Sequence, residues 1–86
     1  MPRKVLKWDV PVDDQLHEIG SGPVVLVACQ HSVDVVSVWT DEDSENIQMR
    51  AAQVYGTGHP VPLFDEHLGS VIPHQALVWH VFGTPL

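Results

Sequence analysis

Two adjacent runs of β-branched residues constrain the fold of this chain more than any other feature. Val24–Cys29 is apolar without interruption, and Val33–Thr40 is a second valine-rich run. Both have the length and composition of β-strands. Only Gln30-His31-Ser32 separates them, which predicts an antiparallel hairpin. The turn could instead be centred on Ser32-Val33-Asp34, which would reverse the faces of one strand, and the sequence leaves both registers open.

The first run is apolar at both its odd and its even positions, which favours a strand that is covered on both faces. Such a strand lies in the middle of a sheet or in a closed barrel, so Val24–Cys29 is predicted to form the middle of the core. Turn-forming residues separate four further predicted strands. These strands are Val5–Val10, Gln15–Ile19, His67–Ile72 with a bulge at Gly69, and Ala76–Phe82.

The segment Ile47–Tyr55 is compatible with two structures. Its glutamine, methionine, arginine and alanine residues favour a helix, which Ser44 could cap. Alternate positions also allow a strand, with Ile47, Met49 and Tyr55 on one side. Intrinsic propensity alone favours the helix.

Length and charge limit the function classes. The 86 residues are enough for one domain, residues 1–86, with a modest core, so self-association would be a natural source of extra stability. The net charge is −7, from 11 acidic and 4 basic residues. Binding to a nucleic-acid backbone needs clustered lysine and arginine, and the sequence has no such cluster beyond its first seven residues. Eight acidic residues are expected to be exposed: Asp13, Asp14, Asp41, Glu42, Asp43, Glu45, Asp65 and Glu66.

Composition also predicts a cytoplasmic protein. The longest apolar run, Val24–Cys29, is far shorter than the roughly 20 residues that span a bilayer, so no membrane segment is expected. Cys29 is the only cysteine and cannot form an internal disulfide, which fits a reducing compartment.

The best candidate site is the segment Tyr55-Gly56-Thr57-Gly58-His59, together with His80 in the last predicted strand. Glycines reach backbone conformations in which successive N–H groups can face an anion. A nucleotide-binding loop would also need a following lysine and a helix, whereas His59-Pro60 follows here. The alternative is a tight structural corner that binds nothing. The sequence leaves both open, and we expect Tyr55, Gly56, Thr57, Gly58, His59 and His80 to surround any ligand.

The remaining polar residues do not predict catalysis. Six histidines occur without the spacings of known metal sites, so neither a metal nor a cofactor is predicted. His31 and Ser32 are adjacent, but in a hairpin turn their side chains point apart, and no catalytic residues are assigned. His59 and His80 are the one pair worth testing. Trp8, Trp39 and Trp79 are expected in the core; an exposed one would be an interface or stacking residue.

Two motifs extend these observations. Together with the strand pattern around them, Tyr55-Gly56-Thr57-Gly58-His59-Pro60 and Val78-Trp79-His80-Val81-Phe82 resemble a small family of uncharacterised proteins from tailed bacteriophages and prophages. The similarity covers nearly the whole chain, although Phe64 to His74 is longer than usual. The resemblance implies an all-β fold of six or seven antiparallel strands, a barrel or a sandwich. It therefore changes the prediction for Ile47–Tyr55 to a strand. It implies no common activity.

The function expected from these arguments is binding. We expect a phage accessory protein in the host cytoplasm that neutralises a host protein or a small anionic immune signal, and that pairs with itself. A capsid-decorating virion protein and a small histidine-dependent hydrolase are the alternatives.

Overall fold

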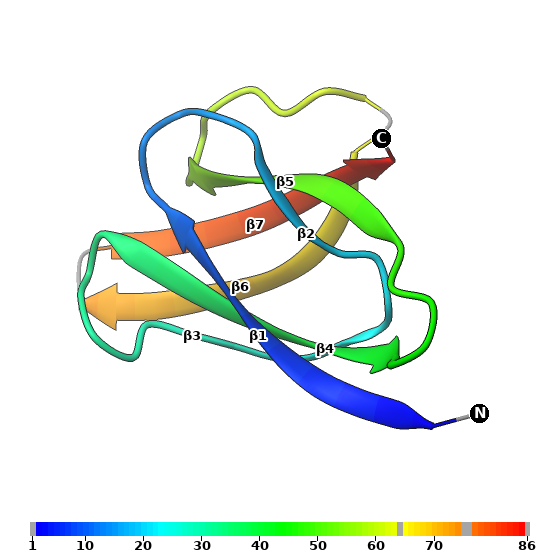
Figure 1. Cartoon of the computed structure of the whole chain (residues 1–86). Helices are drawn as coiled ribbons and strands as arrows, with labels where there is room; N and C mark the ends of the chain where they lie inside the picture. The colour runs from blue at the N-terminus through cyan, green and yellow to red at the C-terminus, as the bar shows by residue number, and fades with distance from the viewer. Residues whose placement is uncertain (1, 64, 75–76, 86) are drawn as a thin grey trace.

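The structure, a computed structural model, describes residues 2–63, 65–74 and 77–85, and these residues form seven antiparallel β-strands (Figure 1). The strands are β1 Arg3–Pro11, β2 His17–Gly20, β3 Val24–Ala28, β4 Val35–Asp43, β5 Met49–Gly56, β6 Glu66–His74 and β7 Leu77–Pro85. No helix occurs in these residues. The predicted all-β fold with six or seven strands is confirmed, and it is a sandwich.

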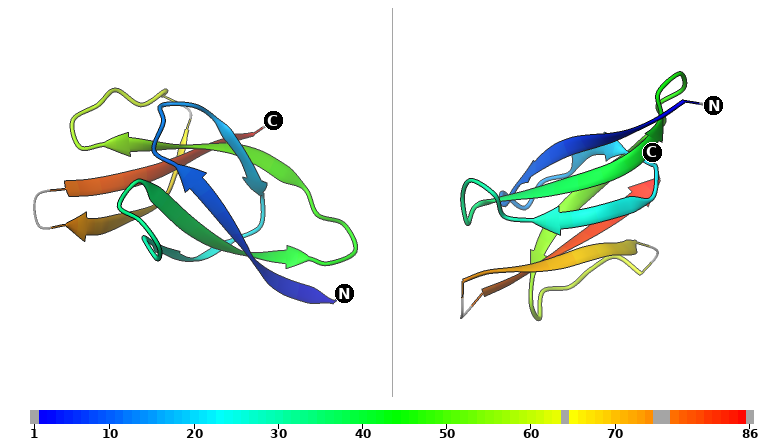
Figure 2. Two further views of the ribbon diagram at one scale, coloured as in Figure 1. Left: turned by 60° about the vertical axis from the view of Figure 1, so that its left-hand side comes forward. Right: turned by 90° about the horizontal axis from the view of Figure 1, so that it is seen from below.

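The strands form two sheets. One sheet has the order β1-β4-β3 and the other has the order β2-β5-β7-β6. The two sheets form separate layers, as Figure 2 shows in its right-hand view. A cluster of seven residues from both sheets forms the core between them: Val10, Ile19, Val36, Val38, Ala52, Val54 and Val81. Most are β-branched residues, which pack well on the inner face of a sheet.

The centre of the three-stranded sheet is β4, and the prediction that Val24–Cys29 is central was wrong. This segment forms the edge strand β3, in which Val25 and Leu26 are more than half exposed. The pairing with β4 shifts between Val24 and Leu26, a bulge that turns two consecutive side chains outward. The hairpin itself is confirmed. Because Val27 pairs with Val38, its turn is centred between Ser32 and Val33, near the second of the two expected positions.

The ambiguous segment is a strand, as the resemblance implied. β5 pairs with β2 on one side and β7 on the other, and Ala52 and Val54 are buried in the core. A helix would place these side chains on different faces, leave β2 without a strand partner and leave β7 paired only with β6. Tertiary pairing therefore overrides the helix propensity of the segment.

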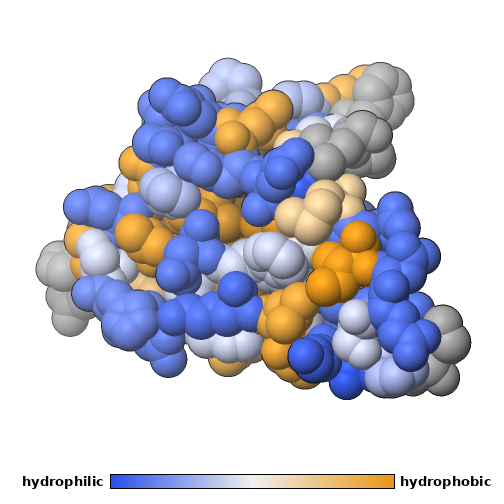
Figure 3. Space-filling view, viewed as in Figure 1, coloured by the Kyte–Doolittle hydropathy of each residue, from blue (hydrophilic) through white to orange (hydrophobic). Residues whose placement is uncertain are grey.

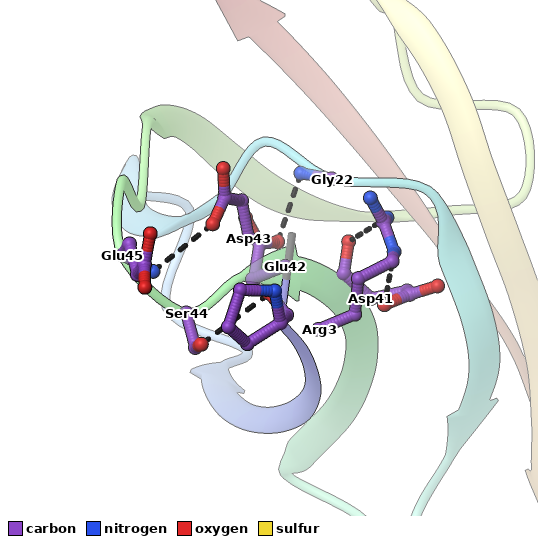
Figure 4. A network of polar contacts seen from close by, with 8 residues as sticks. Arg3, Gly22, Asp41, Glu42, Asp43, Ser44 and Glu45 are labelled. Carbon is purple, nitrogen blue, oxygen red and sulfur yellow. Dashed lines mark hydrogen bonds and ion pairs between the residues drawn. The ribbon is translucent and has the colours of Figure 1, made fainter.

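Glu42 is buried, so its predicted exposure was wrong. β4 continues to Asp43, and alternation along it points Glu42 to the same side as Val38 and Thr40. The Glu42 Oε2 atom accepts a hydrogen bond from the Gly22 N–H at 2.8 Å (Figure 4). The neighbouring Asp41 remains near the surface, where Arg3 Nε donates to its Oδ1 at 3.0 Å. One acidic residue that was expected to be exposed thus holds the β2–β3 connection in place.

The β1–β2 connection contains an ion pair near the surface, and its contribution to stability depends on pH. His17 Nε2 lies 2.8 Å from Asp13 Oδ1, and this hydrogen bond lowers the pKa of the Asp13 carboxyl below its ordinary value of 3.8. A lowered carboxyl pKa stabilises the fold above the ordinary value, and the stabilisation is lost as the pH falls through the folded-state pKa. We expect His17→Ala to move the Asp13 pKa upward in an NMR titration. Equal titration of Asp13 in both proteins would contradict the pairing.

Candidate functional site

A tight turn follows the end of β5. The His59 N–H donates to the Gly56 carbonyl oxygen at 3.2 Å, and Gly58 has a φ of 87°. A positive φ at the third of four residues is the mark of a type II turn, which favours glycine at that position. Nothing lies within 4 Å of where a Gly58 Cβ would be, so the apex of the turn is open. The sequence Gly56-Thr57-Gly58-His59 is therefore a structural corner, and its outer side is accessible.

Thr57, at the second position of the turn, begins a chain of hydrogen-bonded side chains. Thr57 Oγ1 lies 2.9 Å from His80 Nε2, and the other ring nitrogen, Nδ1, lies 2.6 Å from Ser70 Oγ. The Ser70 oxygen is also 2.7 Å from His67 Nε2. Two imidazoles and two hydroxyls, drawn from the turn, β6 and β7, are thus joined in one chain, which we call the histidine–hydroxyl chain.

Strand pairing explains why these residues meet. β7 lies between β5 and β6, and His80 has Tyr55 as its partner on one side and Ser70 on the other. Directly opposed residues in an antiparallel pair have Cβ atoms about 5 Å apart, within hydrogen-bond reach of short side chains. The register of β6 shifts between His67 and Gly69, which confirms the predicted bulge.

Glycine at position 69 is required by close packing between the two sheets. A Cβ on Gly69 would lie 2.5 Å from Val27 Cγ2 of β3. The bulge beside it fixes which residue of β6 faces His80. The position of Ser70 therefore depends on contact between β3 and β6.

A pocket of about 520 Å³ opens beside the turn. Its lining comes from the end of β5, the turn and the start of β7: Gly56, Thr57, His59, Leu77, Val78 and Trp79. A Cβ on Gly56 would lie 3.5 Å from the His59 ring and 3.6 Å from the Trp79 ring, so both rings border this glycine. The Trp79 indole N–H donates to the Val33 carbonyl oxygen at 2.8 Å, which holds the ring in place. The pocket has an apolar wall on β7 and a polar edge on the turn.

The aromatic residues beside the histidine–hydroxyl chain pack against one another. The rings of Tyr55 and Phe82 meet edge to face at 5.8 Å, and His67 lies 5.1 Å from Phe82. Partial burial, and then the negative charge of Asp65, raise the pKa of Tyr55 above its ordinary value of 10.0. Tyr55 is therefore a neutral phenol at physiological pH and contributes packing surface.

The structure brings the predicted site residues into one region, but their contacts differ. Thr57 contacts His80, while Gly56 and His59 line the pocket. Tyr55 lies beside His80 in the sheet and packs on Phe82, whereas Gly58 forms the open apex. The expected pairing of His59 with His80 is replaced by two other contacts. His80 binds Thr57 and Ser70, and His59 lies against Gly56.

Sequence reasoning missed Ser70, and it expected Trp79 in the core, with a stacking role only for an exposed tryptophan. The signal that could have found Ser70 is the predicted bulge at Gly69, since it sets the register that places Ser70 opposite His80. Among the described residues, no group of three histidine, cysteine or acidic side chains is placed to hold a metal ion. In the same part of the chain, no helix is long and apolar enough to cross a membrane.

A two-layered antiparallel sandwich with a turn, a pocket and a histidine–hydroxyl chain on one sheet defines a small all-β domain. The chain belongs to the family described as domain of unknown function DUF7352, whose match spans residues 1–86. No curated protein and no solved structure matches the chain.

Proposed function

We propose that this domain is a phage-type accessory protein that binds and sequesters a small anionic signalling molecule of the host, in the host cytoplasm. The observation that carries the proposal is the pocket beside the turn, with Trp79 on one side and Thr57 and His59 on the other. Its volume of about 520 Å³ falls within the range of roughly 300–1,000 Å³ typical of small-molecule sites. The phage context rests on the two motifs and on the small size of the chain.

The chemistry of the lining favours a nucleotide-like ligand. A planar base can stack on the fixed indole of Trp79, because aromatic rings provide a flat apolar surface. The polar part of the ligand would then meet the Thr57 hydroxyl and the His59 imidazole at the turn. Both are exposed, and hydrogen bonds from such groups orient ligands in largely apolar pockets.

Titration with a panel of linear and cyclic nucleotides tests this proposal. We expect saturable binding of at least one nucleotide, measured by calorimetry and by a change in tryptophan fluorescence. His59→Ala should weaken binding at least about tenfold, because it removes one polar contact worth about 1.4 kcal/mol or more. The melting temperature should change little, since the His59 side chain is exposed.

His17→Ala is the matched control. His17 pairs with Asp13 in the β1–β2 connection, and it does not line the pocket. Equal weakening by both histidine substitutions would contradict the assigned pocket. Failure of the whole panel to bind would contradict the nucleotide-like ligand.

Exposed aliphatic residues on edge strands favour a second candidate, a self-associating virion protein. Val25 and Leu26 of β3 and Ile72 of β6 are each more than half exposed, and small apolar patches interrupt the polar surface in Figure 3. Unpaired strand edges provide hydrogen-bond donors and acceptors for a second copy. Light scattering on the purified domain measures the oligomeric state, and mass spectrometry of purified particles separates a virion component from an intracellular binder.

A further inference from the structure

The histidine–hydroxyl chain has a feature that ligand binding in the pocket does not use. Ser70 Oγ lies within hydrogen-bond distance of two imidazole nitrogens, His80 Nδ1 at 2.6 Å and His67 Nε2 at 2.7 Å. A serine hydroxyl has a single hydrogen and can donate it to only one of them. The other imidazole must then donate its own N–H to the serine oxygen. At any moment, the hydrogen bonds along the four side chains therefore all run in the same direction, each group donating to the next.

One of the two possible directions activates Ser70. If Ser70 donates to His80 Nδ1, that nitrogen carries a lone pair and the ring proton lies on Nε2. The Thr57 oxygen, 2.9 Å from Nε2, can accept a hydrogen bond from this N–H and hold the ring in that tautomer. A hydroxyl hydrogen-bonded to an imidazole whose far nitrogen is held by a third group is the arrangement of an activated serine nucleophile.

We propose that Ser70 is a nucleophile for acyl transfer from small carboxylic esters, with His80 as its general base. Ser70 is exposed on β6, so an ester can reach its oxygen. Thr57 is a positioning residue that acts through His80. In the same direction of donation, His67 Nε2–H donates to the serine oxygen, and we assign it as the donor to the carbonyl oxygen of a bound ester.

The reaction balances with water as the only co-reactant. Ser70 Oγ forms a bond to the ester carbonyl carbon while its proton passes to His80 Nδ1. The carbon–oxygen bond to the alcohol then breaks, and His80 returns the proton to the departing alkoxide. In the second half, His80 takes a proton from water and the hydroxide attacks the acyl carbon. The bond from this carbon to Ser70 Oγ breaks, the carboxylic acid leaves, and His80 returns the proton to Ser70 Oγ. Nucleotide titration and acylation of Ser70 are separate measurements, so either result can fail without the other.

Labelling with a fluorophosphonate probe, located by peptide mass mapping, tests the nucleophile. Attack by Ser70 displaces fluoride, the hydroxyl proton leaves through His80, and a stable phosphonyl-serine remains. Ser32 is the internal control: it is also exposed and lies next to His31 in the sequence, but its oxygen accepts the Asp34 backbone N–H at 3.0 Å. We expect Ser70 to react at least about 100-fold faster than Ser32, the low end of what a positioned base contributes.

Variants separate the chemical roles from structural ones. His80→Gln should reduce labelling of Ser70 to the rate of Ser32, and Thr57→Val should lower it while Thr57→Ser restores it. Melting temperatures measured on the same samples confirm that the variants are folded. With p-nitrophenyl acetate, Ser70→Ala should lose the added acetyl mass that the unsubstituted protein shows. Labelling of Ser70 no faster than Ser32, or unchanged in a folded His80→Gln protein, would overturn the proposal.

Discussion

Alanine at position 22 is expected to lower the free energy of unfolding by about 2–3 kcal/mol, the upper part of the range for overpacking. A Cβ on Gly22 would overlap the Asp41 backbone carbonyl oxygen and would lie 2.7 Å from Glu42 Oε2. The carbonyl belongs to the central strand β4 and cannot move without disturbing the pairing on both sides. Gly22 does not have a positive φ, so the loss reflects crowding and not backbone strain. Urea unfolding monitored by tryptophan fluorescence measures it.

Gly56→Ala is the matched control for this substitution. It makes the same chemical change at another glycine without a positive φ, and its Cβ would make only ordinary contacts of 3.5–3.6 Å. Its effect should remain within about 0.5 kcal/mol. If both substitutions destabilise the protein equally, crowding at Asp41 and Glu42 is not the cause.

Ile19→Ala is expected to cost about 3–4 kcal/mol. Ile19 is fully buried in the core and is the largest of the fully buried side chains. Removal of buried methyl and methylene groups costs their transfer free energy and leaves a cavity, which together amount to about 2–5 kcal/mol for isoleucine. β2 spans only His17–Gly20, so few other contacts of this strand can compensate. Denaturant unfolding again provides the measurement.

Ile72→Ala makes the same chemical change on the surface. Ile72 of β6 is 68% exposed, so its truncation should change stability by less than about 0.5 kcal/mol. A loss at Ile72 as large as that at Ile19 would mean that β6 is covered in solution, for example by a second copy of the chain.

The strands could be predicted because their signals are local. The alternation of apolar and polar residues in Val5–Val10 and the turn-forming residues around each run identify strands wherever these lie in the sheet. The edge position of β3 could not be predicted in this way. An apolar run does not reveal whether it has one strand neighbour or two, and the bulge that exposes Val25 and Leu26 is set by pairing with β4.

At Glu42 and in the segment 47–55, the local sequence preference also failed to predict the structure. Acidic composition predicted that Glu42 is exposed, but β4 continues to Asp43 and turns this carboxylate inward. Propensity favoured a helix for the segment that forms β5, where two neighbouring strands supply its backbone partners. In both places pairing between distant segments outweighed the local preference.

For the candidate site, the sequence by itself identified Gly56 to Gly58 as a ligand loop or a tight structural corner, because glycine adopts the backbone conformations that both need. It also marked Thr57, His59 and His80 as candidate polar groups. Only the tertiary structure decided their partners. The register of β6 and β7, fixed by the bulge at Gly69, places Ser70 against His80 and leaves His59 beside the pocket with Trp79. Ser70 and Thr57 lie 10 and 23 residues from His80 in the sequence, and both reach its ring because strand pairing brings distant segments together. No local sequence pattern encodes these contacts.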